Sequence, residues 1–137
     1  MKNLILASLV ALLAVSAAYG QIESLRVTIP FKFFVENKAL PAGEYRLGVE
    51  PISKRFVITL ADGSDTMFLM PFIAHRRGGV PANSMLVFHK YENNYFLRNV
   101  WTAGHSQGWE WAQSKSERQL AKAVPQRELA FIKAAAK

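Results

Sequence analysis

The segment MLVFHKYENNYFLRNVW, residues 85–101, carries the clearest secondary-structure signal in the chain. Two apolar runs rich in aromatic and branched side chains, residues 85–91 and 95–101, flank the polar triplet Glu92-Asn93-Asn94. Such side chains favour strands, and asparagine tolerates the positive φ that tight turns need. The segment therefore predicts an antiparallel β-hairpin.

Three stretches that precede this hairpin show the same tendency. Apolar and polar side chains alternate over residues 25–33, 43–50 and 56–60, which is the period of a half-buried strand. Pro30 interrupts the first stretch and has no N–H to donate, so we expect that strand at a sheet edge or at a bulge. Asp62-Gly63 is a hairpin signal after the third stretch.

The segment after that turn, residues 66–73, contains the run Met67-Phe68-Leu69-Met70, which is apolar on both faces and predicts a central strand. A last short strand is expected at residues 108–112. About seven strands then follow one another without crossover helices, which predicts an all-β domain, an antiparallel sandwich or small barrel with a short C-terminal helix. The inward rows predict a core of Phe31, Phe33, Tyr45, Leu47, Phe56, Ile58, Leu60, Phe68, Leu86, Phe88 and Leu97.

The C-terminal segment changes period. Ser114-Lys115-Ser116-Glu117 matches a capping box, in which the serine hydroxyl accepts from the Glu117 amide and the glutamate reaches back. A helix over residues 115–123 should follow and dock by Leu120. Pro125 can open a second helix, and we expect the last dozen residues of the chain to be weakly held. The predicted organisation is residues 1–20 as signal peptide, 21–112 as β-domain and 113–137 as basic helical tail.

The N-terminus indicates export. Lys2 precedes an apolar run at residues 4–15, and Ala18 and Gly20 fit a cleavage site before Gln21. A membrane anchor is the alternative, but a span needs about 20 apolar residues. We therefore expect a cleaved signal peptide, a periplasmic or extracellular protein, and no transmembrane span after cleavage.

The positive charge is concentrated at the C-terminal end. The chain has a net charge of +7, and residues 113–137 hold six basic side chains against two acidic ones, a net +4. A basic tail can attract an anionic envelope surface or polysaccharide, whereas export makes nucleic acid an unexpected partner. The alternative is a solvated face that keeps the protein soluble.

Several motifs together resemble a family of small, uncharacterised, exported β-rich proteins of soil-type bacteria. The resemblance covers residues 25–123 and implies an exported β-rich domain, but it carries over no activity, ligand or catalytic residue. It rests on a PFxF…LPAGxY opening at residues 30–33 and 40–45, an LVFxxY…YFLxxVW hairpin at 86–91 and 95–101, and an SxxERxLA helix at 114–121.

Catalytic signatures are missing from the sequence. The chain has no cysteine, no G-x-S-x-G motif and no phosphate-binding glycine loop, so we assign no catalytic residue, metal ligand or cofactor. His75, His89 and His105 lie 14 and 16 residues apart, without a paired metal-ligand spacing. A metal-dependent hydrolase built on these histidines is the least favoured alternative.

Aromatic density is the strongest positive feature, since seven of the 16 aromatic residues lie between positions 88 and 111. Such rings can stack on sugars or apolar ligands, or can simply fill a core. Arg76 and Arg77 could grip an anion, although a solvated loop is the alternative. The candidate ligand-binding residues are Tyr95, Trp101, Trp109 and Trp111.

These observations favour an exported non-enzymatic β-domain that acts through its surface as a binding or structural module of the cell envelope. The first alternative is a carrier that holds a lipid or sugar in an aromatic-lined pocket. The second is the histidine-based hydrolase.

Overall fold

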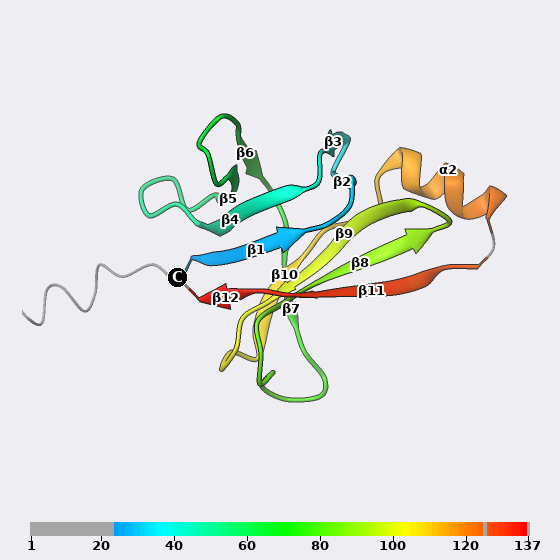
Figure 1. The fold of residues 1–137 in the computed structure, drawn as a ribbon. Coiled ribbons are helices and arrows are strands. Elements are labelled where there is room, and N and C mark those ends of the chain that lie inside the picture. Colours follow the sequence, from blue (N-terminus) through cyan, green and yellow to red (C-terminus); the bar gives the residue numbers. More distant parts are fainter. Residues whose placement is uncertain (1–23, 125, 137) are drawn as a thin grey trace, which may run out of the picture.

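The structure, a computed structural model, describes residues 24–124 and 126–136; the predicted signal peptide and Pro125 lie outside these ranges. Twelve strands and one helix follow one another along the described chain (Figure 1). They are β1 (Leu25–Ile29), β2 (Phe33–Val35), β3 (Lys38–Leu40), β4 (Gly43–Val49), β5 (Phe56–Leu60), β6 (Thr66–Leu69), β7 (Phe72–His75), β8 (Met85–Tyr91), β9 (Asn94–Trp101), β10 (Gln107–Glu110), α2 (Lys115–Ala123), β11 (Glu128–Lys133) and β12 (Ala135–Ala136).

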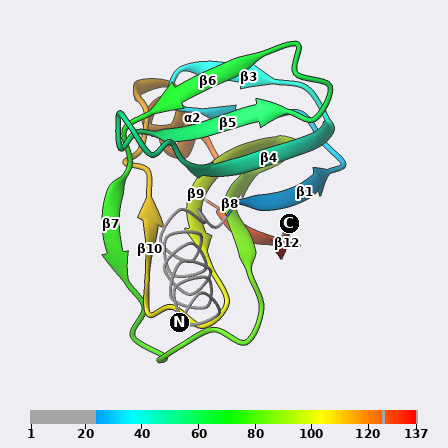
Figure 2. The same ribbon diagram turned by 90° about the vertical axis from the view of Figure 1, so that its left-hand side faces the viewer.

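The strands form two packed sheets. The five-stranded sheet has the order β12-β1-β4-β5-β6, and the seven-stranded sheet has the order β11-β8-β9-β10-β7 with the β2–β3 hairpin attached to β9. Strands of the two sheets cross at a steep angle, as Figure 2 shows. All pairings are antiparallel except that of β2 with β9. The predicted all-β antiparallel sandwich with a short C-terminal helix is confirmed, and neither sheet closes into a barrel.

The chain crosses from one sheet to the other at both edges of the sandwich. On one side β6, an edge strand of the five-stranded sheet, leads through Met70-Pro71 into β7, an edge strand of the seven-stranded sheet. On the other side β11 pairs with β8, and the chain then continues into β12, which pairs with β1. At each edge of the sandwich, two consecutive strands therefore lie in different sheets: β6 and β7 at one edge, and β11 and β12 at the other.

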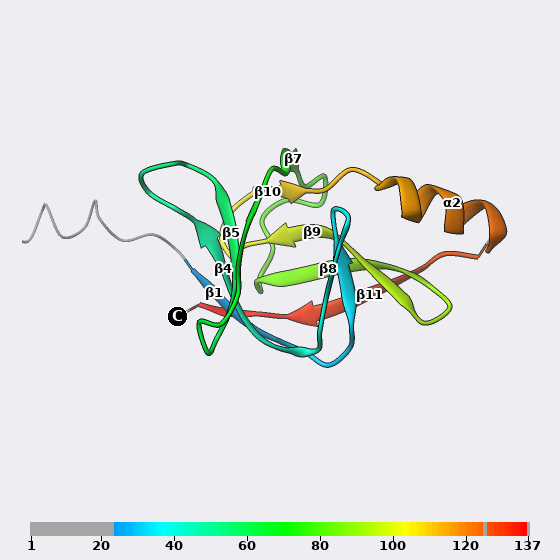
Figure 3. The same cartoon turned by 90° about the horizontal axis from the view of Figure 1, so that it is seen from above.

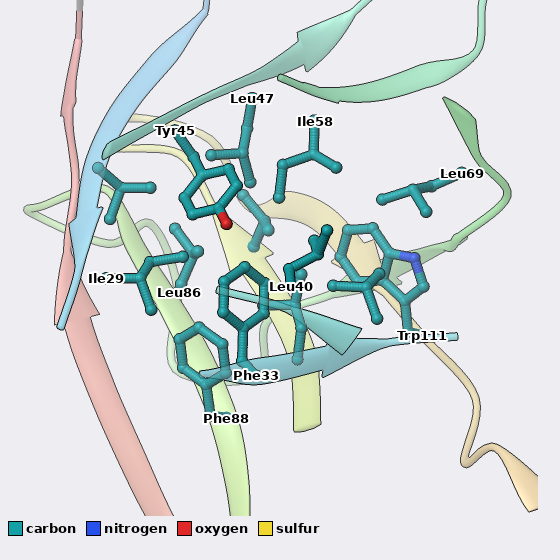
Figure 4. Packing of buried hydrophobic residues seen from close by; sticks show 14 of the residues in the cluster. Ile29, Phe33, Leu40, Tyr45, Leu47, Ile58, Leu69, Leu86, Phe88 and Trp111 are labelled. Carbon is teal, nitrogen blue, oxygen red and sulfur yellow. The ribbon is translucent and has the colours of Figure 1, made fainter. Parts of the chain in front are cut away.

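The core lies between the sheets and is filled by aromatic and aliphatic side chains (Figure 4). The rings of Phe33 and Tyr45 meet edge to face, with centroids 5.3 Å apart. The Tyr45 hydroxyl donates to the carbonyl oxygen of Pro41 at 2.5 Å, which closes the turn of the LPAGxY motif. Eight of the predicted core residues are buried: Phe33, Tyr45, Leu47, Phe56, Ile58, Leu86, Phe88 and Leu97.

The prediction for Phe68 is wrong. Its side chain is 52% exposed, whereas Leu69 is buried and takes the inward position opposite Phe56. The strand that contains both residues, β6, lies at the edge of its sheet rather than in the centre. Phe31 and Leu60 are half-buried and pack against the rim of the core.

The two predicted hairpins are confirmed. β5 and β6 pair across Asp62-Gly63, where Gly63 adopts a φ of 78° and the Asp62 carboxylate accepts from the Ser64 amide at 2.8 Å. β8 and β9 pair across the turn at residues 92–93. Glu92 takes the positive φ there, 57°, instead of an asparagine.

The C-terminal segment differs in part from the prediction. Helix α2 is confirmed, with the Ser114 hydroxyl accepting from the Glu117 amide at 3.2 Å. The prediction of a second helix is wrong, because residues 128–133 form strand β11 and residues 135–136 form strand β12. Ala130 and Ile132 point inward at strand period and pack against the core. Residues 128–133 therefore pair in the seven-stranded sheet and residues 135–136 in the five-stranded sheet, instead of forming a helix.

Candidate functional site

The four aromatic candidates do not converge on one site. Trp111 is 2% exposed and meets Phe56 edge to face in the core, at 5.1 Å between ring centroids. Trp109 is half-buried and also contacts Phe56, at 5.2 Å. Tyr95 is half-buried and stacks on Phe31, with centroids 3.7 Å apart. These three rings therefore pack on phenylalanines of the core and its rim.

Trp101 lies on the opposite face of the seven-stranded sheet from Trp109. It pairs with Gly108 on β10, whereas Trp109 pairs with the buried Val100. A Cβ atom at Gly108 would lie 2.4 Å from Cε3 of Trp101, so the glycine allows the indole to lie flat on the neighbouring strand. The aromatic-lined pocket of the carrier hypothesis is therefore not assembled from these four residues.

A small hollow adjoins Trp109 at the end of β7 and β10. Its volume is about 190 Å³, below the range of about 300–1,000 Å³ usual for ligand pockets. One of the four aromatic candidates lines it, together with the polar loop that follows β9. The lining residues are Ile73, Thr102, His105, Gln107, Gly108 and Trp109.

The three histidines occupy separate surroundings. His75 ends β7, His89 lies buried in the middle of β8, and His105 lies in the loop before β10. Within residues 24–124 and 126–136, no three histidine, aspartate or glutamate side chains could hold a metal ion together. The three histidines are therefore not grouped as metal ligands in the described part of the chain.

A buried ion pair that the sequence analysis missed joins helix α2 to the seven-stranded sheet. Nη2 of Arg98 donates to Oε2 of Glu117 at 2.7 Å, and Nη1 of Arg98 donates to the Trp111 carbonyl oxygen at 2.6 Å. Nη2 also lies 3.1 Å from Nδ1 of His89, and the Tyr91 hydroxyl donates to the same Glu117 oxygen at 3.2 Å. The Glu117 carboxylate is therefore bound by side chains of β8 and β9 and does not reach back to cap its own helix.

The protonation of this cluster is set by its surroundings. Burial raises the pKa of the Glu117 carboxyl, but contact with His89, the charge of Arg98 and the Tyr91 hydrogen bond together lower it by more. The pKa of Glu117 therefore lies below its ordinary value, and the pair with Arg98 is ionised at neutral pH. Oε2 of Glu117 contacts Arg98, Tyr91 and His89, all from β8 and β9, so these contacts tie α2 to the seven-stranded sheet. Figure 3 shows α2 at the far end of the molecule from the β4–β5 turn.

The open edge of β7 is the feature most suited to binding. The Arg76 amide donates to the Ser106 carbonyl at 2.9 Å, and the pairing of β7 with β10 continues in the same register. Since hydrogen-bonded pairs alternate in an antiparallel ladder, Phe72, Ala74 and Arg76 direct their backbone groups to β10. The N–H and C=O groups of Ile73 and His75 therefore point away from the sheet, along the edge visible in Figure 2.

Contacts from the β2–β3 hairpin lie at both ends of the edge strand β6. The Glu36 carboxylate, on the β2–β3 turn, accepts from the Met70 amide at 3.1 Å. Nζ of Lys38 in the same hairpin lies 3.3 Å from the Asp65 carboxylate. Edge strands are commonly covered or charged in this way to prevent unwanted pairing. β7 itself, of sequence FIAH, has neither a lysine nor a proline within it.

Apolar side chains surround this open edge. We call Phe68, Met70, Phe72 and Ile73 the β6–β7 apolar strip; their exposed fractions are 52%, 83%, 65% and 69%. They lie within six consecutive residues, and Arg76 and Arg77 follow after Ala74 and His75, the first arginine half-buried and the second exposed. Exposed apolar residues that cluster in this way mark interaction sites more often than isolated ones do. The two arginines are among the residues that the sequence predicted for binding, whereas Phe68 was predicted to lie in the core.

The comparisons with known proteins add no identity to this geometry. No family model, no curated protein and no solved structure matches the chain. In the described part of the chain, no helix is long and apolar enough to cross a membrane.

Proposed function

We propose that this protein is an exported, non-enzymatic interaction module that binds an extended polypeptide strand along the open edge of β7. The observation that carries the proposal is the pair of outward-directed backbone groups at Ile73 and His75, beside the exposed β6–β7 apolar strip. A strand added to a sheet edge gains affinity from main-chain hydrogen bonds and specificity from alternate side chains. β7 offers both kinds of contact.

A polypeptide strand fits this surface better than a small ligand does. The hollow of about 190 Å³ next to Trp109 is too small for a lipid and opens beside Ile73 of the edge strand. It can instead take one side chain of a bound strand. The carrier alternative would require a larger cavity lined by several of the aromatic candidates.

Site-specific photo-crosslinking in producing cells tests the proposal. A benzoylphenylalanine at Phe72 should give a discrete crosslinked polypeptide. The same probe at Phe131 is the matched control, because Phe131 is 60% exposed on β11, the edge strand at the other side of the same sheet. Crosslinking at Phe72 that exceeds the control supports the proposal. Equal yields at both positions, or none at Phe72, would refute it.

Export is part of the proposal and has its own test. Lys2, the apolar run at residues 4–15 and the small residues Ala18 and Gly20 support a cleaved signal peptide. Mass spectrometry of the protein recovered from periplasm or medium should find a mature chain that begins at Gln21. Recovery of the uncleaved chain from the cytoplasm would contradict export.

A second interaction, with an anionic envelope surface or polysaccharide, is supported by the exposed face of α2. Lys115, Arg118 and Lys122 are exposed and spaced by three and four residues, so they share one face, away from the buried Glu117. Retention on anionic vesicles should fall as salt rises, because the Debye length is about 8 Å at physiological ionic strength. The triple variant with glutamine at these three positions should lose that retention; if it binds as wild type does, the basic face is not a binding element.

A further inference from the structure

We infer that the strand which occupies the open edge of β7 is β7 of a second copy, paired antiparallel across a two-fold axis. This inference rests on the proposed function and names the partner. The interface would be isologous, since each copy presents the same edge to the other. Three features of β7 and its neighbour β10 support a self-complementary contact.

The first feature is the main chain. In each copy the outward-directed backbone groups belong to Ile73 and His75, two residues apart. When Ile73 faces His75 of the second copy, both residues exchange N–H···O=C bonds, and the symmetric pair does the same. This register makes four bonds within β7, and the next pair in the ladder, Pro71 with Arg77 of the second copy, lies beyond the ends of the strand. Moving the pairing toward the N-terminal end of β7, so that Ile73 faces Pro71 of the second copy, would bring Pro71, which has no N–H, into a hydrogen-bonded position.

The second feature is the fit at the axis. In this register Ala74 of one copy lies opposite Ala74 of the other, as a non-hydrogen-bonded pair with its Cα atoms about 4.5 Å apart. Such a close pair accommodates small side chains well. A large residue at this position would separate the strands, so the alanine at the centre favours the pairing.

The third feature is charge. Phe72 pairs with Glu110 on one side, and the same register places Arg76 of the second copy on its other side. All three side chains then lie in one row on one face, with strands about 4.8 Å apart. The Arg76 guanidinium can lie over the Phe72 ring and reach Glu110, and the two-fold axis makes this contact twice. Within the described chain, neither Arg76 nor Glu110 forms an intramolecular ion pair.

The interface is small, so the association should be weak and dependent on concentration. Pairing joins the β11-β8-β9-β10-β7 paths of the two copies into one continuous path of ten strands and covers Phe72 and Ile73. Contacts of this size lie at the lower end of specific interfaces. Sedimentation equilibrium between about 10 µM and 1 mM should therefore show a monomer–dimer equilibrium in the wild-type protein.

A charge swap tests the register directly. Arg76→Glu and Glu110→Arg should each weaken self-association at least about ten-fold, because each places like charges together at two symmetric contacts. An equimolar mixture of the two variants should associate again, since a heterodimer restores both opposite-charge contacts. Arg77→Glu is the control and should leave association close to wild type. Failure of the mixture to associate, or equal loss in Arg77→Glu, would overturn the register.

A backbone variant tests the edge without any change of charge. Ile73→Pro removes an outward N–H and leaves the ladder with β10 in place, so the monomer should stay folded by circular dichroism and lose association. If Ile73→Pro does not fold, the charge-swap experiment still decides the matter. A wild-type protein that stays monomeric up to about 1 mM refutes the second copy as partner. The proposed function then still stands if Phe72 crosslinks to a different polypeptide in cells.

Discussion

Replacement of Glu117 by alanine should cost far more stability than an ordinary helix-surface substitution. Its carboxylate is 3% exposed and accepts hydrogen bonds from Arg98 and Tyr91. In this variant Arg98 cannot turn toward solvent, because its side chain is 10% exposed and also donates to the Trp111 carbonyl oxygen. The variant therefore leaves a buried guanidinium without a counter-charge.

The magnitude follows from that burial. Removing one partner of a buried ion pair costs about 3–5 kcal/mol in the free energy of unfolding. Helix α2 has nine residues, too few to be stable alone in water, so its position depends on such contacts. Glu117→Gln retains an oxygen for Arg98 and Tyr91 and should cost less, about 1–3 kcal/mol.

Urea unfolding followed by circular dichroism measures this difference. Glu128→Ala is the matched control, since the Glu128 carboxylate is 71% exposed and lies 3.7 Å from Nζ of Lys90. An exposed pair contributes about 0–1 kcal/mol. The double variant Arg98→Met, Glu117→Leu should recover most of the loss, because an apolar pair of similar size needs no counter-charge.

Two results would refute this reasoning. If Glu117→Ala costs no more than Glu128→Ala, the ion pair does not hold α2 on the sheet. If the double variant is as unstable as Glu117→Ala, the unpaired charge of Arg98 is not the cause of the loss.

Three further expectations follow from the same structure. The pKa of Glu117 in the folded protein lies below its ordinary value. The ionised carboxylate therefore adds to the free energy of unfolding above the unfolded pKa, and this contribution is lost as pH falls through the lower folded pKa. Urea titrations from about pH 6 to pH 2 should show the wild type losing more stability than Glu117→Gln. Deleting residues 126–137 removes β11 and β12 and should abolish cooperative thermal unfolding, whereas a native-like melt would show that these strands are dispensable. Phe33→Ala should cost about 3–5 kcal/mol and Phe68→Ala less than about 1 kcal/mol in urea unfolding, and equal costs would contradict the inward assignment of Leu69.

Period-two alternation predicted the strands that have one buried face. Val27, Tyr45 and Ile58 lie in rows where every second residue is apolar, and the structure buries each of them. The pattern succeeds there because it records the burial of one face directly. The turns at Asp62-Gly63 and Glu92-Asn93 were predictable for a different reason, since their residue types suit tight bends.

Uniformly apolar segments could not be resolved in the same way. Residues 67–70 and 129–132 are apolar at every position, so periodicity does not show which side chains point inward. In both segments the structure places a residue of intermediate or full burial next to an exposed one, at a sheet edge. Whether a strand is central or at an edge depends on long-range pairing, which no local pattern encodes.

The candidate site was predicted least well. The capping box located Glu117 but not its partner Arg98, which lies 19 residues away at an irregularity of the β8–β9 ladder. An arginine inside an otherwise apolar strand was the available signal, because a buried charge needs a partner. The open edge of β7 had no local signal, since it depends on which strand ends the sheet.

Backbone hydrogen exchange at β7 tests the central claim most directly. In dilute protein, the amides of Ala74 and Arg76 should exchange slowly, because they donate to β10, and those of Ile73 and His75 should exchange fast. At concentrations where the protein associates, Ile73 and His75 should become protected while amides on the exposed face of α2 stay unchanged. Protection of Ile73 and His75 in the dilute monomer, or no change on association, would contradict the binding edge.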